Sequence, residues 1–214
     1  MIEHKSISLA DQVFEHLETD ILSGKYQRGE SLTENKLSAE LGVSRTPIRE
    51  ALRRLEQEHL IEETQKGMVV VGISEKDLED IFLIRAKLEG QAAAMAAKNH
   101  TPEQLEVVRE ALEFQEFYLE KQDPDRIKSM DSRFHETIYK MSGSTIFYDV
   151  LLPLHKKILK YRKASVTDSS RASASVAEHR AIYNALLARD SELAYRLVSE
   201  HLENAYKHIS NGEK

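Results

Sequence analysis

Residues 74–214 place the strongest constraint on the fold, because this long stretch carries almost no sign of β-strands. It shows no convincing alternation of apolar and polar residues, and its only prolines stand at positions 102, 124 and 153. Strands that are buried on one face need such alternation, whereas helices do not. We therefore predict that the carboxy-terminal two thirds of the chain is entirely helical.

Helix-start signals and turn residues divide this stretch further. Ser74 with Asp77, and Thr101-Pro102 with Gln104, are typical of helix amino termini. The predicted helices cover residues 75–99, 102–121, 125–142, 145–163, 172–189 and 191–210. Residues 91–97 are mostly alanine, which predicts that a neighbouring helix approaches closely there.

The first 73 residues have a different organisation, which begins with short helices. Apolar residues at helical spacing from Leu9 to Leu22 predict a first helix, and Gly24 closes it. A second short helix over residues 34–41 is broken by Gly42. The two helices are separated by an extended stretch.

A third helix follows, and its outer face is basic. We expect it to start at Pro47 with Thr46 as its cap, because a residue before proline is held away from helical geometry. Arg45, Arg49 and Arg53 stand four residues apart and so form one exposed row. Guanidinium groups suit guanine edges and phosphate oxygens alike. Two short helices with a glycine turn and a basic second helix are the arrangement of a helix-turn-helix.

Two strands complete this part of the chain. Residues 60–63 and 68–71 have strand character, and Gln65-Lys66-Gly67 between them is a turn with a cation at its tip. A hairpin in this place is a wing. Arginines alone more often mark a solvated helix face, but the turn, the cap, the row and the wing in sequence favour DNA binding.

Composition restricts the chemistry and the partners. There is no cysteine, so any metal must be bound by nitrogen and oxygen donors. No segment approaches the roughly 18 apolar residues of a membrane span, and we expect a cytoplasmic protein. The net charge is −6, so bulk charge does not indicate nucleic-acid binding. Residues 45–54, however, hold four arginines and a single acid.

The amino-terminal third resembles the GntR superfamily of bacterial winged-helix transcription regulators. The resemblance is carried by Leu41-Gly42-Val43-Ser44-Arg45-Thr46-Pro47-Ile48-Arg49-Glu50-Ala51-Leu52, by Arg54-Leu55-Glu56 and by Gly67 in the wing. It covers nearly all of residues 7–72 and implies a double-stranded DNA operator as partner. The resemblance implies that Arg45 and Arg49 contact bases and that Ser44 and Thr46 contact phosphates. It also implies that Lys66 and Gly67 at the wing tip contact the minor groove.

Four polar residues interrupt the apolar helix faces of the second part. Asp131 and His135 are four residues apart, so they share one face of a helix. His179 and His201 stand on the apolar sides of the last two predicted helices. Three imidazoles and one carboxylate suit zinc, nickel, manganese or iron(II), and helical bundles commonly hold metals in this way. A lone inward histidine is nevertheless more often a hydrogen-bonded core residue, and we assign that role to the other six.

Residues 74–210 resemble the effector domain of FadR-type regulators, known as FCD, in its metal-binding form. The resemblance is carried by Arg85-x-x-Leu88-Glu89, Asp131-x-x-Phe134-His135, Glu178-His179-x-x-Ile182 and His201. It implies a divalent metal on Asp131, His135, His179 and His201, at the floor of a pocket that takes a small organic acid. Arg85 is the candidate for binding that acid, since its fork matches a carboxylate. A salt bridge with Glu89 is nearly as good an explanation for Arg85.

These inferences combine into one hypothesis. We predict a mainly α-helical fold, with a winged helix-turn-helix DNA-binding domain in residues 1–73 and an all-helical bundle of six or seven helices in residues 74–214. The bundle would bind the effector and form a homodimer, and the protein would regulate transcription. Two alternatives stay open: a metal-dependent enzyme on a small organic acid with Glu178 as base, and a metal-free regulator that binds an acyl-type ligand.

Overall fold

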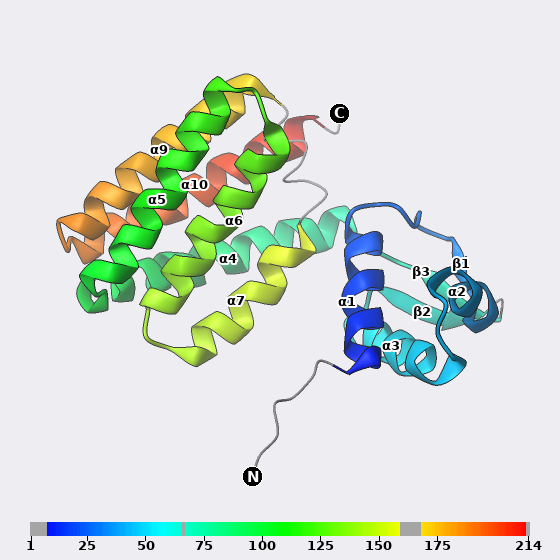
Figure 1. Cartoon of the computed structure of the whole chain (residues 1–214). Coiled ribbons are helices and arrows are strands. Elements are labelled where there is room, and N and C mark those ends of the chain that lie inside the picture. Colours follow the sequence, from blue (N-terminus) through cyan, green and yellow to red (C-terminus); the bar gives the residue numbers. More distant parts are fainter. Residues whose placement is uncertain (1–7, 66, 159–167, 213–214) are drawn as a thin grey trace, which may run out of the picture. The chain divides into compact units, whose positions relative to one another are not determined.

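The structure is a computed structural model that describes residues 8–65, 67–158 and 168–212 (Figure 1). The chain divides into two compact units, Met1–Glu75 and Lys76–Lys214. Helices dominate both units. The predicted fold class, a winged helix-turn-helix followed by a helical bundle, is confirmed.

The first unit combines three helices with a small antiparallel sheet. Its elements are α1 (Leu9–Leu22), β1 (Ser31–Leu32), α2 (Glu34–Leu41), α3 (Arg45–Gln57), β2 (Ile61–Thr64) and β3 (Gly67–Val70). Strand β3 lies between β1 and β2, and Leu32 of β1 pairs with Met68 of β3. Leu17, Leu37 and Leu55 are fully buried and bring the three helices together in one core.

The start of α3 differs from the prediction. Ser44, not Thr46, is the amino-terminal cap residue, and the helix begins at Arg45. Pro47 therefore lies within the first turn, where its missing N–H removes no helical hydrogen bond. Gly42 ends α2 with a φ of 67°, a left-handed conformation that glycine adopts without strain.

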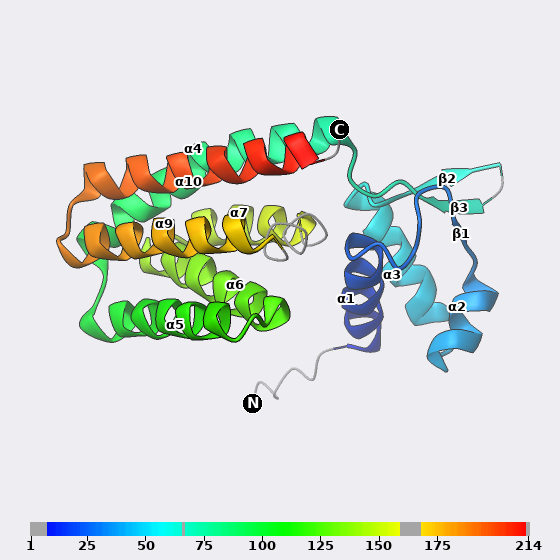
Figure 2. The ribbon, with the colours of Figure 1, turned by 90° about the horizontal axis from the view of Figure 1, so that it is seen from above.

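The second unit is a bundle of helices. Within the described residues its elements are α4 (Glu75–Asn99), α5 (Pro102–Glu120), α6 (Pro124–Met141), α7 (Thr145–Lys157), α9 (Ser169–Leu187) and α10 (Ser191–Gly212). Helix α5 contacts α6 and α9, α9 contacts α10, and α6 contacts α7. Figure 2 shows α4 and α10 running along the same side of this bundle.

Two boundaries in the bundle depart from the expected ones. Helix α9 begins three residues earlier than predicted, because the Asp168 side chain accepts hydrogen bonds from the backbone of Ser170 and Arg171. Helix α7 ends at Lys157, and residues 159–163 of the helix predicted there lie outside the described residues. Among the described residues, each helix is too short or too polar to cross a membrane.

Close helix contacts involve a glycine as well as the predicted alanines. Ala92, Ala93, Ala96 and Ala97 are fully buried, as expected of packing residues. A Cβ on Gly90 would stand 2.6 Å from the Ser199 Oγ of α10. Since the Ser199 hydroxyl donates to the Ala86 carbonyl at 3.0 Å, α10 is held against α4. This contact positions the helix that carries His201.

Candidate metal centre

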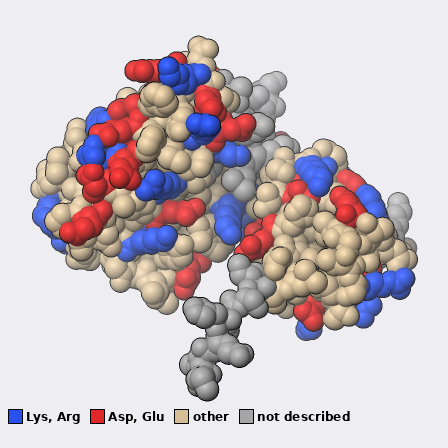
Figure 3. Space-filling model, in the orientation of Figure 1, with Lys and Arg blue, Asp and Glu red and all other residues tan. Residues whose placement is uncertain are grey.

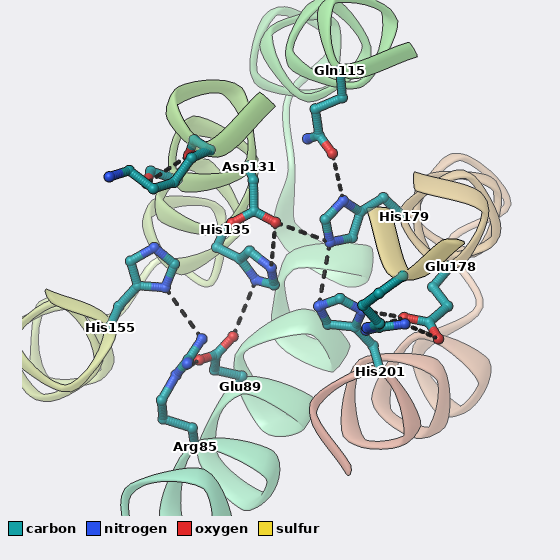
Figure 4. Close-up of polar contacts among 12 residues, drawn as sticks. Arg85, Glu89, Gln115, Asp131, His135, His155, Glu178, His179 and His201 are labelled. Carbon is teal, nitrogen blue, oxygen red and sulfur yellow. Dashed lines mark hydrogen bonds and ion pairs between the residues drawn. The ribbon is translucent and has the colours of Figure 1, made fainter. Parts of the chain in front are cut away.

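Asp131, His135, His179 and His201 converge inside the bundle (Figure 4). Helix α6 supplies the first two, and α9 and α10 supply one histidine each. One nitrogen from each of the three imidazoles lies within 4.8 Å of the others. The Nε2 atoms of His179 and His201 are 3.3 Å apart. Asp131 Oδ1 is 3.7 Å from His179 Nε2 and 4.0 Å from His135 Nε2.

The local sequence explains why these side chains point inward. His179 shares its face of α9 with Ile182 and Leu186, which are fully buried. His201 lies beside the buried Leu202 and on the side of Ala194, so burial of the apolar face of α10 carries its imidazole inward. The predicted inward orientation of both histidines is confirmed.

Each imidazole has an oxygen beside Nδ1, as a hydrogen-bond partner for His179 and His201 and as an ion-pair contact for His135. His179 Nδ1 is 2.7 Å from Gln115 Oε1, and His201 Nδ1 is 2.6 Å from Glu178 Oε2. His135 Nδ1 lies 3.2 Å from Glu89 Oε2. An oxygen acceptor requires the proton on Nδ1, which leaves the lone pair on Nε2. The rings of His179 and His201 are therefore set to present Nε2 to each other, and His135 Nε2 lies 4.0 Å from Asp131 Oδ1 beside them.

The spacing of these donors fits a metal ion. Two imidazole nitrogens on one tetrahedral Zn²⁺ at about 2.0–2.1 Å stand about 3.3 Å apart, and the Nε2 atoms of His179 and His201 are separated by 3.3 Å. Lone pairs that face each other at this distance repel unless a cation attracts them both. The carboxylate of Asp131 adds a negative donor beside them.

Burial sets the charge of the groups at the centre. Burial lowers the pKa of His201 to about 4, although the hydrogen bond to Glu178 opposes the shift. His201 is therefore neutral at pH 7, the form that binds metals. Burial alone would raise the pKa of Glu178, but hydrogen bonds from His201 and Arg171 outweigh it and bring the pKa to about 2.

Arg85 lies in the same interior but is already paired. Its Nε donates to Glu89 Oε1 at 2.5 Å, and its Nη2 stands 3.2 Å from His155 Nδ1. Both members of the pair are almost completely buried. The structure thus contains the salt bridge that the sequence offered as the alternative to effector binding. Within the described part of the chain, the buried Nη1 of Arg85 makes no hydrogen bond.

A cavity of about 50 Å³ adjoins three of the four donors, Asp131, His135 and His201. Arg85, Asp131, His135, Arg171 and His201 line it, together with apolar side chains of several helices. The Arg85 guanidinium and three of the candidate metal donors therefore share one small interior space.

Several residues of this centre escaped the sequence analysis. Gln115 and Arg171 carry no motif, and nothing in the sequence distinguishes them from other polar residues of amphipathic helices. Glu89 was noted only as a partner of Arg85. Glu178 entered the sequence analysis as part of the FCD-like motif and as a base in the enzyme alternative, and the structure places it against the Nδ1 side of the His201 ring.

The predicted DNA-contacting residues gather at the start of α3 in the first unit. Ser44 occupies the cap position without a side-chain capping hydrogen bond, and Arg45, Thr46 and Arg49 are exposed in the first two turns. Arg49 is held by Glu34 of α2, with both N–O distances at 2.9 Å. Gly67 begins β3 with a φ of 93°. Lys66 lies outside the described residues.

Charge on the surface is mixed. In Figure 3 acidic and basic side chains are interspersed over the visible face, in agreement with the small net charge. The arginine row Arg45, Arg49 and Arg53 is exposed as predicted. This exposed row is the feature of the first unit suited to DNA.

Comparisons with known proteins agree on both units. Residues 9–71 match the family of bacterial regulatory proteins called gntR, and residues 80–204 match the FCD domain. The gluconate operon transcriptional repressor of Bacillus licheniformis is 28% identical over 189 residues, which cover 86% of this chain and 78% of the relative. The transcriptional repressor RspR of Escherichia coli K12 is 27% identical over 193 residues, 90% of this chain and 85% of the relative. The solved structure of E. coli McbR/YncC, 25% identical, has a TM-score of 0.83 and covers 98% of this chain and 100% of its own.

The buried pair Arg85–Glu89 should be important for stability. Glu89→Ala leaves the Arg85 charge buried without its partner, and we expect it to lower the free energy of unfolding by about 3–5 kcal/mol. Urea unfolding of metal-free protein, followed by circular dichroism, measures this loss. Glu106→Ala, which breaks an exposed pair with Arg109, is the control and should cost about 0–1 kcal/mol. Equal losses of unfolding free energy in Glu89→Ala and Glu106→Ala would contradict a stabilising role for the buried Arg85–Glu89 pair.

Proposed function

The chain belongs to the gntR family of bacterial regulatory proteins and carries an FCD domain, and on that premise we propose that a divalent metal and a small organic acid control its affinity for an operator. Like its relatives, which are named transcriptional repressors, the protein is a transcription regulator and not an enzyme. We assign DNA binding to residues 1–73, and effector binding and dimerisation to residues 74–214. Such a regulator works in the cytoplasm, where the operator lies.

One observation carries the metal assignment: three imidazoles converge beside Asp131, each with an oxygen next to its Nδ1. Nitrogen and carboxylate donors suit zinc, nickel, manganese and iron(II) alike. A bound ion would supply a positive centre for an acid's oxygen. The chain's part is to hold four donors in a buried place from which bulk water is largely excluded.

The cavity beside these donors supports a small acid as effector. Arg85 lines it, and its buried Nη1 is available to a carboxylate oxygen. Because Glu89 already holds the other side of the guanidinium, we assign Arg85 to the second oxygen of an acid that reaches the metal. One relative is named for an operon of gluconate, which is itself a small organic acid.

Control of DNA binding follows from linkage between the two units. An effector changes operator affinity only if it binds the DNA-competent and incompetent arrangements unequally. We propose a homodimer on a pseudo-palindromic operator, with one winged helix on each half-site. Exposed apolar side chains on α4 and α7 offer a surface for dimerisation: Leu83, Ile84, Ile146 and Val150.

Metal content tests the site directly. Protein purified without chelator should retain about one divalent ion per chain, and His135→Ala/His179→Ala should lose it because two of four donors are gone. Elemental analysis of the dialysed proteins gives the measurement. His100→Ala removes a buried histidine outside the centre and should leave metal content unchanged. Equal content in all three proteins would refute the site and favour a metal-free regulator with an acyl-type ligand.

Operator binding tests the role of α3. Arg49→Ala should weaken binding by about 1–3 kcal/mol and relax selectivity at one base pair, because a guanidinium fork reads guanine. Mobility-shift titrations against the operator and its single-base variants measure both effects. Arg196→Ala, which removes an exposed arginine of α10, should bind as the wild type does. Undiminished and equally selective binding by Arg49→Ala would count against the assignment.

A further inference from the structure

Glu178 stands at the centre of a dense set of hydrogen bonds between α9 and α10 (Figure 4). Its Oε2 accepts from His201 Nδ1 at 2.6 Å. Arg171 lies seven residues before Glu178 on α9 and donates to both carboxylate oxygens at 3.0 Å. Asn204 of α10 donates to Oε1 at 3.0 Å. Both oxygens are therefore held, and the plane of the carboxylate is fixed.

A fixed carboxylate fixes the imidazole that it contacts. The His201 ring, held at Nδ1, can present only Nε2 to the interior, where His179 Nε2 is 3.3 Å away. Without an acceptor at Nδ1, the ring could turn about its χ2 angle and take the other tautomer. Carboxylates that orient a metal-binding histidine in this way raise its basicity as a ligand.

The contact geometry excludes Glu178 itself as a ligand in this arrangement. Its oxygens meet the His201 ring on the side opposite Nε2, and they are occupied by Arg171 and Asn204. Arg171 in turn is largely buried and lines the same cavity as Asp131, His135 and His201. The chain of contacts thus runs from the cavity wall through Glu178 to His201.

We propose that Glu178 is a positioning residue that aims His201 Nε2 at the metal, and that Arg171 holds Glu178 in place. The proposal rests on the proposed metal site. Glu178 meets the Nδ1 side of the His201 ring, and Arg171 acts on that ring through Glu178. The Arg171 and Glu178 side chains are 8% and 23% exposed. It predicts that metal affinity depends on Arg171, a cation that lies beyond the ligands.

If Arg171 acted only through its charge, removing it would have the opposite effect on metal affinity. Removing a cation near a metal site lowers the repulsion on the metal and should raise its affinity. Removing the brace of Glu178 should instead lower the affinity, because the His201 ring is less well oriented. The direction of the change in Arg171→Ala therefore separates positioning from simple electrostatics.

The chain also offers a matched control. Arg180 binds Glu116 through two contacts, at 3.0 and 2.6 Å, and so forms an Arg–Glu fork of the same kind on the outside of α5 and α9. Each residue of this fork is next in sequence to a residue of the centre, Gln115 or His179. Glu116→Ala removes a comparable ion pair without touching an imidazole of the site.

The experiment measures Zn²⁺ affinity of the full-length protein by competition with a chromophoric chelator, with no organic acid added. We expect Glu178→Ala to lose about 10–100-fold in affinity. Glu178→Gln, which keeps an acceptor of the same size, should lose less. Arg171→Ala should also bind Zn²⁺ more weakly than the wild type, and Glu116→Ala should bind it equally well.

Two further measurements keep the outcomes distinct. Wild type and His201→Ala test the metal site itself: if the wild type does not bind Zn²⁺, or His201→Ala binds it unchanged, the proposed site is wrong. If that site holds, unchanged affinity in Glu178→Ala overturns the positioning role, as does a gain in Arg171→Ala. Thermal unfolding of the metal-free variants reports purely structural damage. A loss of stability in Glu178→Ala with wild-type Zn²⁺ affinity would make Glu178 only a link between helices.

Discussion

The arrangement of the bundle interior depends on the oxygens that meet the three imidazoles at Nδ1, two through hydrogen bonds and one through an ion-pair contact. Gln115, Glu178 and Glu89 come from α5, α9 and α4, and the histidines they meet come from α9, α10 and α6. Each contact therefore ties two helices together as well as orienting one ring. A bundle that packed differently would lose the orientation of its donors, so the packing of the helices and the chemistry of the centre are inseparable.

Burying so many polar groups is costly, and the structure offsets the cost by pairing. Glu89 and Glu178 each carry an arginine partner, Arg85 and Arg171. The result is two chains of the form Arg–Glu–His that approach the same point from different helices. Burial of a carboxylate without such partners would raise its pKa and favour the neutral acid. The guanidinium beside Glu89 and the groups around Glu178 instead lower both pKa values, so the carboxylates stay ionised.

How far the sequence could predict this centre differs from residue to residue. Asp131 and His135 were predictable because helical spacing puts residues four apart on one face, and His179 and His201 because each follows an apolar stripe. Gln115 was not, since its partner His179 stands 64 residues away. Arg171 was not either, because its spacing of seven residues from Glu178 on one helix does not by itself indicate an ion pair. The cap of α3 was wrongly predicted at Thr46. Every position of a helix's first turn tolerates proline, and here Pro47 is the third helical residue rather than the first. The salt bridge of Arg85 was foreseen only as one of two possibilities, because spacing along a helix is equally compatible with both.

The central claim is that the three imidazoles and Asp131 hold one divalent ion inside the bundle. X-ray absorption spectroscopy at the zinc edge of the Zn²⁺-loaded protein tests it most directly, because imidazole rings give a characteristic outer-shell signal. The account predicts nitrogen and oxygen ligands at about 2.0–2.2 Å with the scattering of three imidazoles. A spectrum without imidazole scattering, as from an ion held by surface carboxylates and water, would contradict it.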